Sequence, residues 1–354
     1  MVDISAYVDD AFIGQIGVAK GGRRIIDVQE RAQLLEALDG SSYQVSAGGS
    51  LSNSIVGVAR LGMANSSLTD SGPLRIGMLS VAGSDAQGAF HNAQMQQAGV
   101  QLLSSPCPGS ATGTVIVMTT PDANRTFMSY LGSSQELQLT AEAEAAISST
   151  RLLIIEGYLW EMQGATKAIG RAISLARGSG ATIVLTTGDP GLVARHRQEF
   201  WEQLDSGSVD VLFANREEAE QLLGRAVAAS QAALELGSMC SVAAITDGPN
   251  GSYISALGRL QSIPPFWREH PPMDTCGAGD AYTAGFLYGF LSGLDVASMG
   301  RFSARVASAV ISRPGACLSA PEARQIVEQI PAIAEQHRHG AILAMADGLS
   351  SPIR

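Results

Sequence analysis

The second half of the chain alternates short apolar runs with stretches of helical periodicity. The apolar runs show no polar alternation and occupy residues 152–155, 181–185, 209–213 and 241–246. Helical periodicity follows the first three of them, at 165–176, 192–204 and 216–223. Strands that are apolar on both faces and separated by helices are typical of a parallel sheet covered by helices on both sides. We therefore predict an α/β fold, with functional loops beyond the carboxyl ends of the strands.

The flanking regions also contain regular patterns. Before the parallel sheet we expect strands at 2–8 and 75–81, helices at 27–38 and 51–61, and a hairpin formed by 112–120 and 126–131. Gly62 is the expected end of the second helix, and Asp85 is the expected N-cap of a helix ending at Gly99. After the sheet we expect strands at 253–256 and 258–263 and helices at 281–292, 295–311 and 322–330.

Neither a repeat nor a low-complexity linker interrupts the chain, so we expect residues 1–354 to form a single domain. The tail at 331–354 contains an apolar patch at 342–345 but no motif. The first strand starts almost at the initiator Met, and we therefore expect that a few upstream residues are missing from this start.

Composition narrows the class of protein. Hydrophobic residues make up 45% and charged residues 16%, which indicates a packed globular protein. The net charge of −10 argues against a nucleic-acid partner. No apolar run reaches the roughly 18–20 residues of a membrane span, and the acidic N-terminus lacks a signal-peptide pattern. The four cysteines are far apart, so we expect reduced thiols in a cytoplasmic protein.

A run of small residues at 273–281 carries the clearest candidate chemistry. It passes through Gly277 and Gly279 to Asp280 and opens directly into the helix expected at 281–292. A helix N-terminus has unpaired N–H groups and a partial positive charge, and glycine lets an anion approach the backbone. A carboxylate beside a bound phosphate is unfavourable unless it takes a proton. The pattern suggests that Asp280 is a general base for an alcohol that attacks a phosphoryl group.

Other polar residues have both a structural and a functional interpretation. Asp3 is either a solvated strand start or a hydroxyl acceptor. Arg125 is either an exposed strand residue or a guanidinium aimed at a phosphate. Asn215 is consistent with an N-cap and with a ligand contact at once, and Glu218 with an ordinary first-turn glutamate.

Together, these stretches resemble the ribokinase-like carbohydrate and nucleoside kinases, or PfkB family. Residues 274–280 resemble the family's D-T-x-G-A-G-D signature at six of seven positions. Four shorter motifs precede this signature in the chain, in the order typical of the family. They are Gly48-Gly49 with Asn53, Gly83 with Asp85 and Gly88, Asn215 with Glu218, and Thr246 with Gly248 and Gly251. The resemblance covers residues 1–330. The stretches 2–9, 48–54 and 125–132 are similar to the adenosine-kinase-like branch.

The resemblance implies a role for each motif. Asp280 is the expected base, and Gly277, Ala278 and Gly279 are the expected backbone anion hole. The implied acceptor-binding residues are Asp3, Gly48, Gly49 and Asn53, and the implied ATP- and phosphate-binding residues are Arg125, Asn215, Glu218, Thr246, Gly248 and Gly251. The implied cofactors are ATP and Mg²⁺, with Mg²⁺ held through water near Asn215 and Glu218 and without a direct side-chain ligand. Some family members also use K⁺, for which Asp274, Gly315 and Ser319 are the candidate neighbours.

The family fold is a central, mostly parallel sheet between helices in three layers, with a small β-sheet lid. Here the lid is expected from residues 6–17, 42–47 and 112–131. One departure is the missing G-x-N before the first aspartate. A second is Cys276 at a variable position, which we interpret as a packing group and not as a nucleophile.

The identity of the acceptor stays open at this point. The partner is a small molecule, either an adenosine-like nucleoside or a sugar, as in kinases of the ribokinase or fructokinase type. A non-catalytic nucleotide or sugar sensor is the alternative of a different class, against which the intact Asp280 counts. A dinucleotide-dependent oxidoreductase needs a G-x-G-x-x-G turn that residues 11–20 lack. A monomer and a homodimer are both compatible with an exposed lid edge.

Overall fold

A mostly parallel sheet forms the centre of the larger part of the molecule. The computed structural model describes residues 1–39, 42–64, 74–122, 124–162 and 164–330. Within these residues, the sheet has six strands in the order β13-β12-β11-β10-β9-β8. Its strands are β8 (Leu152–Glu156), β9 (Thr182–Thr186), β10 (Val211–Asn215), β11 (Val242–Thr246), β12 (Ser252–Ala256) and β13 (Arg259–Ile263). β8 to β11 are parallel, and β12 and β13 return antiparallel, which confirms the predicted α/β architecture.

Helices cover both faces of this sheet, which explains why its strands are continuous apolar runs. Ile183 and Leu185 of β9 pack in one buried cluster, whereas Val184 between them packs in a cluster on the opposite face. The first face is covered by α6 (Ala165–Gly178), α7 (Pro190–Arg195), α8 (Arg197–Asp205), α9 (Arg216–Leu223) and α10 (Ala229–Leu236). The second is covered by α3 (Ser50–Ala64), α11 (Ala278–Leu291) and α12 (Val296–Val310), with α13 (Ala320–Val327) packed against α3 and α12.

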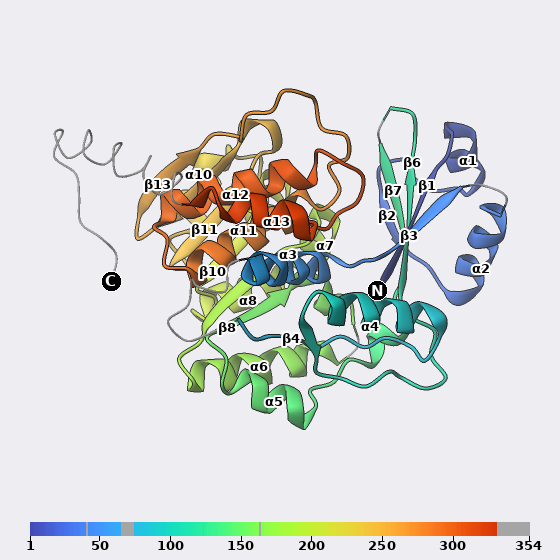
Figure 1. Cartoon of the computed structure of the whole chain (residues 1–354), viewed down its shortest axis with the longest axis horizontal. Coiled ribbons are helices and arrows are strands. Elements are labelled where there is room, and N and C mark those ends of the chain that lie inside the picture. Colours follow the sequence, from blue (N-terminus) through green and yellow to red (C-terminus); the bar gives the residue numbers. More distant parts are fainter. Residues whose placement is uncertain (40–41, 65–73, 123, 163, 331–354) are drawn as a thin grey trace.

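A second sheet stands beside the main body and carries α1 (Asp10–Gln15) and α2 (Val28–Ala37) on its outer side (Figure 1). Among the described residues its strand order is β2-β7-β6-β1-β3. The strands are β1 (Val2–Tyr7), β2 (Arg23–Ile25), β3 (Tyr43–Ala47), β6 (Thr114–Thr119) and β7 (Arg125–Tyr130). β6 and β7 form the predicted hairpin. All three segments expected in the lid contribute to this unit, although 6–17 supplies the end of β1 and then helix α1.

Smaller elements complete the described chain. They are β4 (Ile76–Met78), α4 (Ala86–Gln97), β5 (Val100–Leu102), α5 (Ala141–Ile147) and the short helices η1 (Gly132–Glu136), η2 (Gly157–Glu161) and η3 (Gly248–Asn250). Asp85 caps α4 as predicted, since its side chain accepts a hydrogen bond from the Gly88 N–H at 2.8 Å. In the described part of the chain, no helix is long and apolar enough to cross a bilayer. The tail at 331–354 lies outside the described residues.

Three boundary predictions were wrong. The helix expected to end at Gly62 continues to Ala64, because glycine is tolerated inside a helix and packs here against Leu74. The single helix expected at 192–204 is divided into α7 and α8 at His196, whose backbone leaves the helical region. The strand expected at 75–81 pairs only over β4.

Candidate active site

The carboxyl ends of the four parallel strands bring polar residues to one edge of the main sheet. Glu156 ends β8, Asn215 ends β10, and Thr246 ends β11. Asn215 and Thr246 are register partners on neighbouring strands, so two of the predicted ATP-side residues lie side by side. This edge is where ligands bind in open α/β sheets.

The N-terminus of α11 lies in a tight turn that only glycine fits. Gly277 has φ +74°, in the left-handed region, and a Cβ there would lie 2.5 Å from the Ala316 carbonyl oxygen and 2.7 Å from its Cα. Gly277 is the N-cap of α11, and no side chain of the described chain caps that helix. The Ala278 N–H donates to the Thr275 carbonyl at 3.3 Å, and the binding of an anion by the N–H groups of this turn stays a prediction.

Asp280 stands in the first turn of α11 and is held by two donors from α3. Its Oδ1 accepts a hydrogen bond from Ser50 Oγ at 2.7 Å, and its Oδ2 accepts one from Asn53 Nδ2 at 2.9 Å. Gly57 lets the two helices approach closely, since a Cβ at this position would lie only 2.6 Å from the Ala284 Cβ. Withdrawal from solvent raises the pKa of Asp280, and the two hydrogen bonds oppose that rise.

Asp3 and the glycine pair lie on the same side as Asp280. The Asp3 carboxyl sits directly over Gly48, where a Cβ would overlap it. Burial raises the pKa of Asp3 to about 6, and the negative charge of Asp280 adds to the rise. The structure thus brings Asp3, Gly48 and Asp280 together.

Glu156 is a site residue that the sequence interpretation missed. Its Oε2 accepts a hydrogen bond from the Leu51 N–H at the start of α3, at 2.9 Å. Burial raises the pKa of Glu156 to about 7, and the charge of Asp280 raises it further. The one signal in the sequence was an acidic residue directly after the apolar run 152–155.

The predicted nucleotide side is formed by turns after β10 and β11. Asn215 caps α9 in a capping box with Glu218, whose Oε1 accepts a hydrogen bond from Asn215 Nδ2 at 2.7 Å. Gly248 and Gly251 both have positive φ, and a Cβ on Gly251 would overlap the backbone of β13. The N-cap interpretation of Asn215 is confirmed, and its contact with a ligand stays a prediction.

The raised pKa of Glu218 predicts how the stability of the fold depends on pH. It is buried, and burial raises its pKa from an ordinary 4.5 to about 7. The folded state therefore binds more protons than the unfolded state between these values, and Glu218 should lower the free energy of unfolding as pH rises through this window. The slope from one such group is at most about 1.4 kcal/mol per pH unit. Denaturant titrations from pH 5 to 8 should show a flatter profile for Glu218→Gln.

The neighbouring Glu217→Gln is the matched control, because Glu217 is exposed on the same helix turn. A Glu218→Gln profile parallel to that of the control would contradict the assigned titration of Glu218.

Arg125 ties the second sheet to the turn that precedes α11. Its Nη1 lies 3.2 Å from Asp274 Oδ1, and its Nη2 donates to Thr275 Oγ1 at 2.6 Å. The guanidinium therefore lies beside the turn that precedes α11, within the surroundings where we predicted a phosphate. Cys276 in that turn keeps its proton, because burial raises the pKa of its thiol to about 12. This protonation state agrees with the interpretation of Cys276 as a packing group.

Arg23 is a second arginine that joins the two sheets. Its Nη1 lies 2.7 Å from Glu161 Oε2 and 3.3 Å from Asp189 Oδ2, and its guanidinium stacks over the Tyr158 ring at 4.6 Å. The Glu161 side chain is only 3% exposed and also binds Arg195. This cluster connects β2 with η2 and the start of α7.

Loss of the Arg23 side chain should destabilise the fold measurably. Arg23→Ala leaves the buried Glu161 carboxylate and the partly buried Asp189 carboxylate with fewer partners, so we expect the free energy of unfolding to fall by about 1–3 kcal/mol. Arg24→Ala is the matched control, since Arg24 forms a half-exposed pair with Glu30 and should cost less than about 1 kcal/mol. Urea unfolding of both variants tests this difference, and equal losses would show that the cluster adds nothing.

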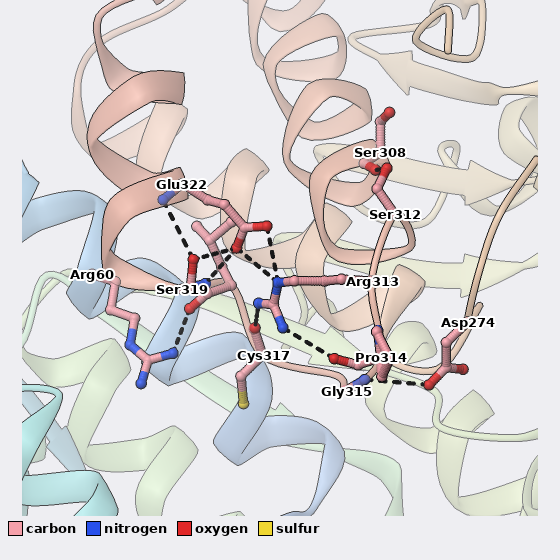
Figure 2. A network of polar contacts seen from close by, with 11 residues as sticks. Arg60, Asp274, Ser308, Ser312, Arg313, Pro314, Gly315, Cys317, Ser319 and Glu322 are labelled. Carbon is pink, nitrogen blue, oxygen red and sulfur yellow. Dashed lines mark hydrogen bonds and ion pairs between the residues drawn. The ribbon is translucent and has the colours of Figure 1, made fainter. Parts of the chain in front are cut away.

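Of the three candidate neighbours of a K⁺ ion, the structure brings Asp274 and Gly315 together but not Ser319. The Gly315 N–H points at Asp274 Oδ2 at 3.4 Å, whereas the Ser319 hydroxyl is bonded to Glu322 at the start of α13 (Figure 2). Among the described residues, no group of three acidic, His or Cys side chains could hold a metal ion. The binding of Mg²⁺ through water and the roles of Mg²⁺ and K⁺ stay predictions.

Comparison with known proteins decides the family. The profile of the pfkB family carbohydrate kinases matches residues 16–323, from the end of α1 into α13. The chain belongs to this family. Its members are kinases, and the residues that form the turn before α11 and the ends of β10 and β11 all lie within the matched range. Asp3 lies before it.

Individual relatives agree on kinase activity but differ in acceptor. The crystal structure of adenosine kinase from Sinorhizobium meliloti has 31% identity and a TM-score of 0.81, covering 92% of this chain and 96% of that one. The 5-dehydro-2-deoxygluconokinase of Shouchella clausii is 25% identical over 91% of this chain and 96% of its own length. The nucleoside kinase of Methanothermobacter thermautotrophicus is 27% identical over 73% of this chain and 80% of its own. The pfkB-family chain is thus a carbohydrate or nucleoside kinase with the ribokinase-like fold.

Proposed function

We propose that this pfkB-family kinase transfers the γ-phosphoryl group of ATP to a primary hydroxyl of an adenosine-like nucleoside. The observation that carries the proposal is the position of Asp280. Its carboxylate stands in the first turn of α11, beside an uncapped helix N-terminus, and Ser50 and Asn53 hold it in place. A base and an anion site side by side suit phosphoryl transfer to an alcohol.

Asp280 removes the proton of the attacking hydroxyl. Its raised pKa makes it a stronger base than an exposed aspartate, which helps it take a proton from an alcohol. Asp3 and the backbone of Gly48 and Gly49 bind other hydroxyls of the acceptor and orient it. Asn53 has a second amide hydrogen, beyond the one given to Asp280, that is available to the same acceptor.

The backbone N–H groups of Gly277 to Gly279 bind the phosphoryl group during transfer. They are fixed before the reaction, so they stabilise the developing charge without reorganisation. Thr246, Gly248 and Gly251 line the ATP side together with Asn215. Arg125 exchanges Asp274 for a phosphate oxygen when ATP binds. Asn215 and Glu218 would hold Mg²⁺ through water, and the ion would offset phosphate charge.

A nucleoside acceptor is supported by the inner face of the second sheet. Ile116 and Met128 face α1 and α2, so Val117 and Phe127 point to the other side of the sheet. Arg23 and Arg125 lie on that same side and contact the main body. An aromatic ring flanked by an aliphatic residue suits a planar base better than a polyhydroxylated chain. The likeness to an adenosine kinase points the same way.

A coupled assay with ATP and a panel of acceptors tests the proposal. The panel contains adenosine, guanosine, cytidine, ribose, fructose and 5-dehydro-2-deoxygluconate. We expect the highest kcat/KM with adenosine. Turnover confined to the sugars would replace the nucleoside with a sugar acceptor. Binding of ATP and adenosine without turnover of any acceptor would favour the non-catalytic sensor.

A further inference from the structure

We propose that Cys317 is a positioning residue for the reaction, because it orients the Asn53 amide that holds Asp280. This inference rests on the proposed role of Asp280 as the base. Cys317 lies between α12 and α13, 264 residues from Asn53 in sequence, and no motif contains it.

Three side chains form a chain of hydrogen bonds that ends at the base. The Cys317 thiol donates to Asn53 Oδ1 with a sulfur–oxygen distance of 3.0 Å, and Asn53 Nδ2 donates to Asp280 Oδ2 at 2.9 Å. An asparagine amide has a carbonyl on one side and an NH₂ group on the other. A donor placed against the carbonyl therefore selects the orientation that turns NH₂ to the carboxylate. The reversed amide would set a carbonyl dipole against a carboxylate and remove one donor from the base.

The loop that carries Cys317 is fixed on both sides of the thiol. Arg313 donates to the carbonyl oxygens of Pro314 and Cys317 and pairs with Glu322 at 2.9 Å (Figure 2). Arg60 of α3 donates to the Leu318 carbonyl. The loop is thus tied to α3, the helix that carries Asn53, and to α13. The same loop contacts the turn that precedes α11, since Ala316 packs against Gly277.

The thiol has the properties of a donor and not of a nucleophile. Burial raises the pKa of Cys317 to about 11, so the sulfur keeps its proton at neutral pH. A protonated thiol is a weak donor, and a serine hydroxyl at the same place is a stronger one. Serine should therefore preserve the orientation of Asn53, whereas alanine removes the donor.

The test compares Cys317→Ala with Cys317→Ser in pH profiles of kcat/KM for adenosine. Without the thiol, the Asn53 amide is free to turn and to stop donating to Asp280. Loss of that hydrogen bond should raise the pKa of Asp280 further, so the acid limb of Cys317→Ala should move upward by about one pH unit. On the acid limb this lowers kcat/KM by about tenfold, and the deficit should shrink as pH rises toward the plateau. Cys317→Ser should stay within about twofold of the wild-type enzyme. Cys240→Ala is the matched control, because the Cys240 thiol donates to the backbone carbonyls of Leu236 and Val242 and packs in the core beside α10, with no hydrogen bond to Asn53 or Asp280 among the described residues.

An unshifted acid limb in folded Cys317→Ala would overturn the proposal, as would a limb in Cys317→Ser shifted as far as that of the alanine variant. Where melting curves show that Cys317→Ala is unfolded, Cys317→Val fills the space without a donor and takes its place. Asp280→Asn in the same assay separates the two hypotheses. An active Asp280→Asn enzyme refutes the base itself, whereas an inactive one beside an unaffected Cys317→Ala refutes only the role of Cys317.

Discussion

Asp280→Asn is expected to lower kcat by about 10²–10⁴-fold, the range that a positioned general base supplies. Asparagine has nearly the same shape and can still accept one hydrogen bond, so Ser50 and Asn53 keep much of their packing. It cannot take the proton of the acceptor hydroxyl. The loss should therefore appear in kcat, while the dissociation constant for ATP and the melting temperature change little.

Steady-state kinetics with adenosine and ATP, together with calorimetric titration of ATP, measure these quantities. Asp27→Asn is the matched control, because Asp27 is an exposed N-cap of α2 and asparagine caps equally well. Its kcat should equal that of the wild-type enzyme. An Asp280→Asn enzyme with near-normal kcat would rule out the assigned base.

Gly277→Ala should lower kcat nearly as much as Asp280→Asn does, because of the geometry of the turn. A Cβ at this position meets the Ala316 backbone at 2.5–2.7 Å, and φ +74° is unfavourable for alanine. Either the turn or the loop at Ala316 must shift, which misplaces the N–H groups that bind the phosphoryl. We expect kcat to fall by about 10²–10³-fold, as for loss of an oxyanion donor, and the free energy of unfolding to fall by about 1–3 kcal/mol.

Gly279→Ala provides the control for folding in the same turn. A Cβ at Gly279 has no neighbour within 4 Å, and alanine is the better helix former, so stability should stay equal or increase. Urea unfolding of both variants tests the argument. Equal stability of Gly277→Ala and Gly279→Ala would contradict the strain assigned to Gly277.

Much of the fold could be predicted because both faces of the main sheet are buried. Continuous apolar runs such as Val184 with its neighbours Ile183 and Leu185 leave no alternative to a covered parallel strand. The hairpin of β6 and β7 was equally clear from its turn. The division of the expected helix 192–204 into α7 and α8 at His196 could not be predicted, because a local change of the backbone leaves the apolar pattern unchanged. Helices α5 and α10 were missed because alanine fills most of their buried positions, and alanine marks an apolar face less clearly than a large hydrophobic residue does.

The predicted site residues followed from motifs, but their supporting residues could not. Ser50 is 230 positions from Asp280, and its contact exists only because Gly57 lets α3 and α11 approach closely. Glu156 contacts Leu51 of α3 across 105 positions. Cys317 likewise reaches Asn53 only through the fold. Such proximity depends on tertiary packing, which the spacing of residues in one sequence does not encode.

The central claim is that a phosphoryl group moves from ATP to a primary hydroxyl, with Asp280 as the base. The most direct test is ³¹P NMR of the product formed from ATP and the best acceptor of the panel. We predict one new phosphomonoester signal split by a neighbouring CH₂ group, formed by the wild-type enzyme and absent with Asp280→Asn. Release of inorganic phosphate alone, or a phosphate on a secondary hydroxyl, would contradict the account.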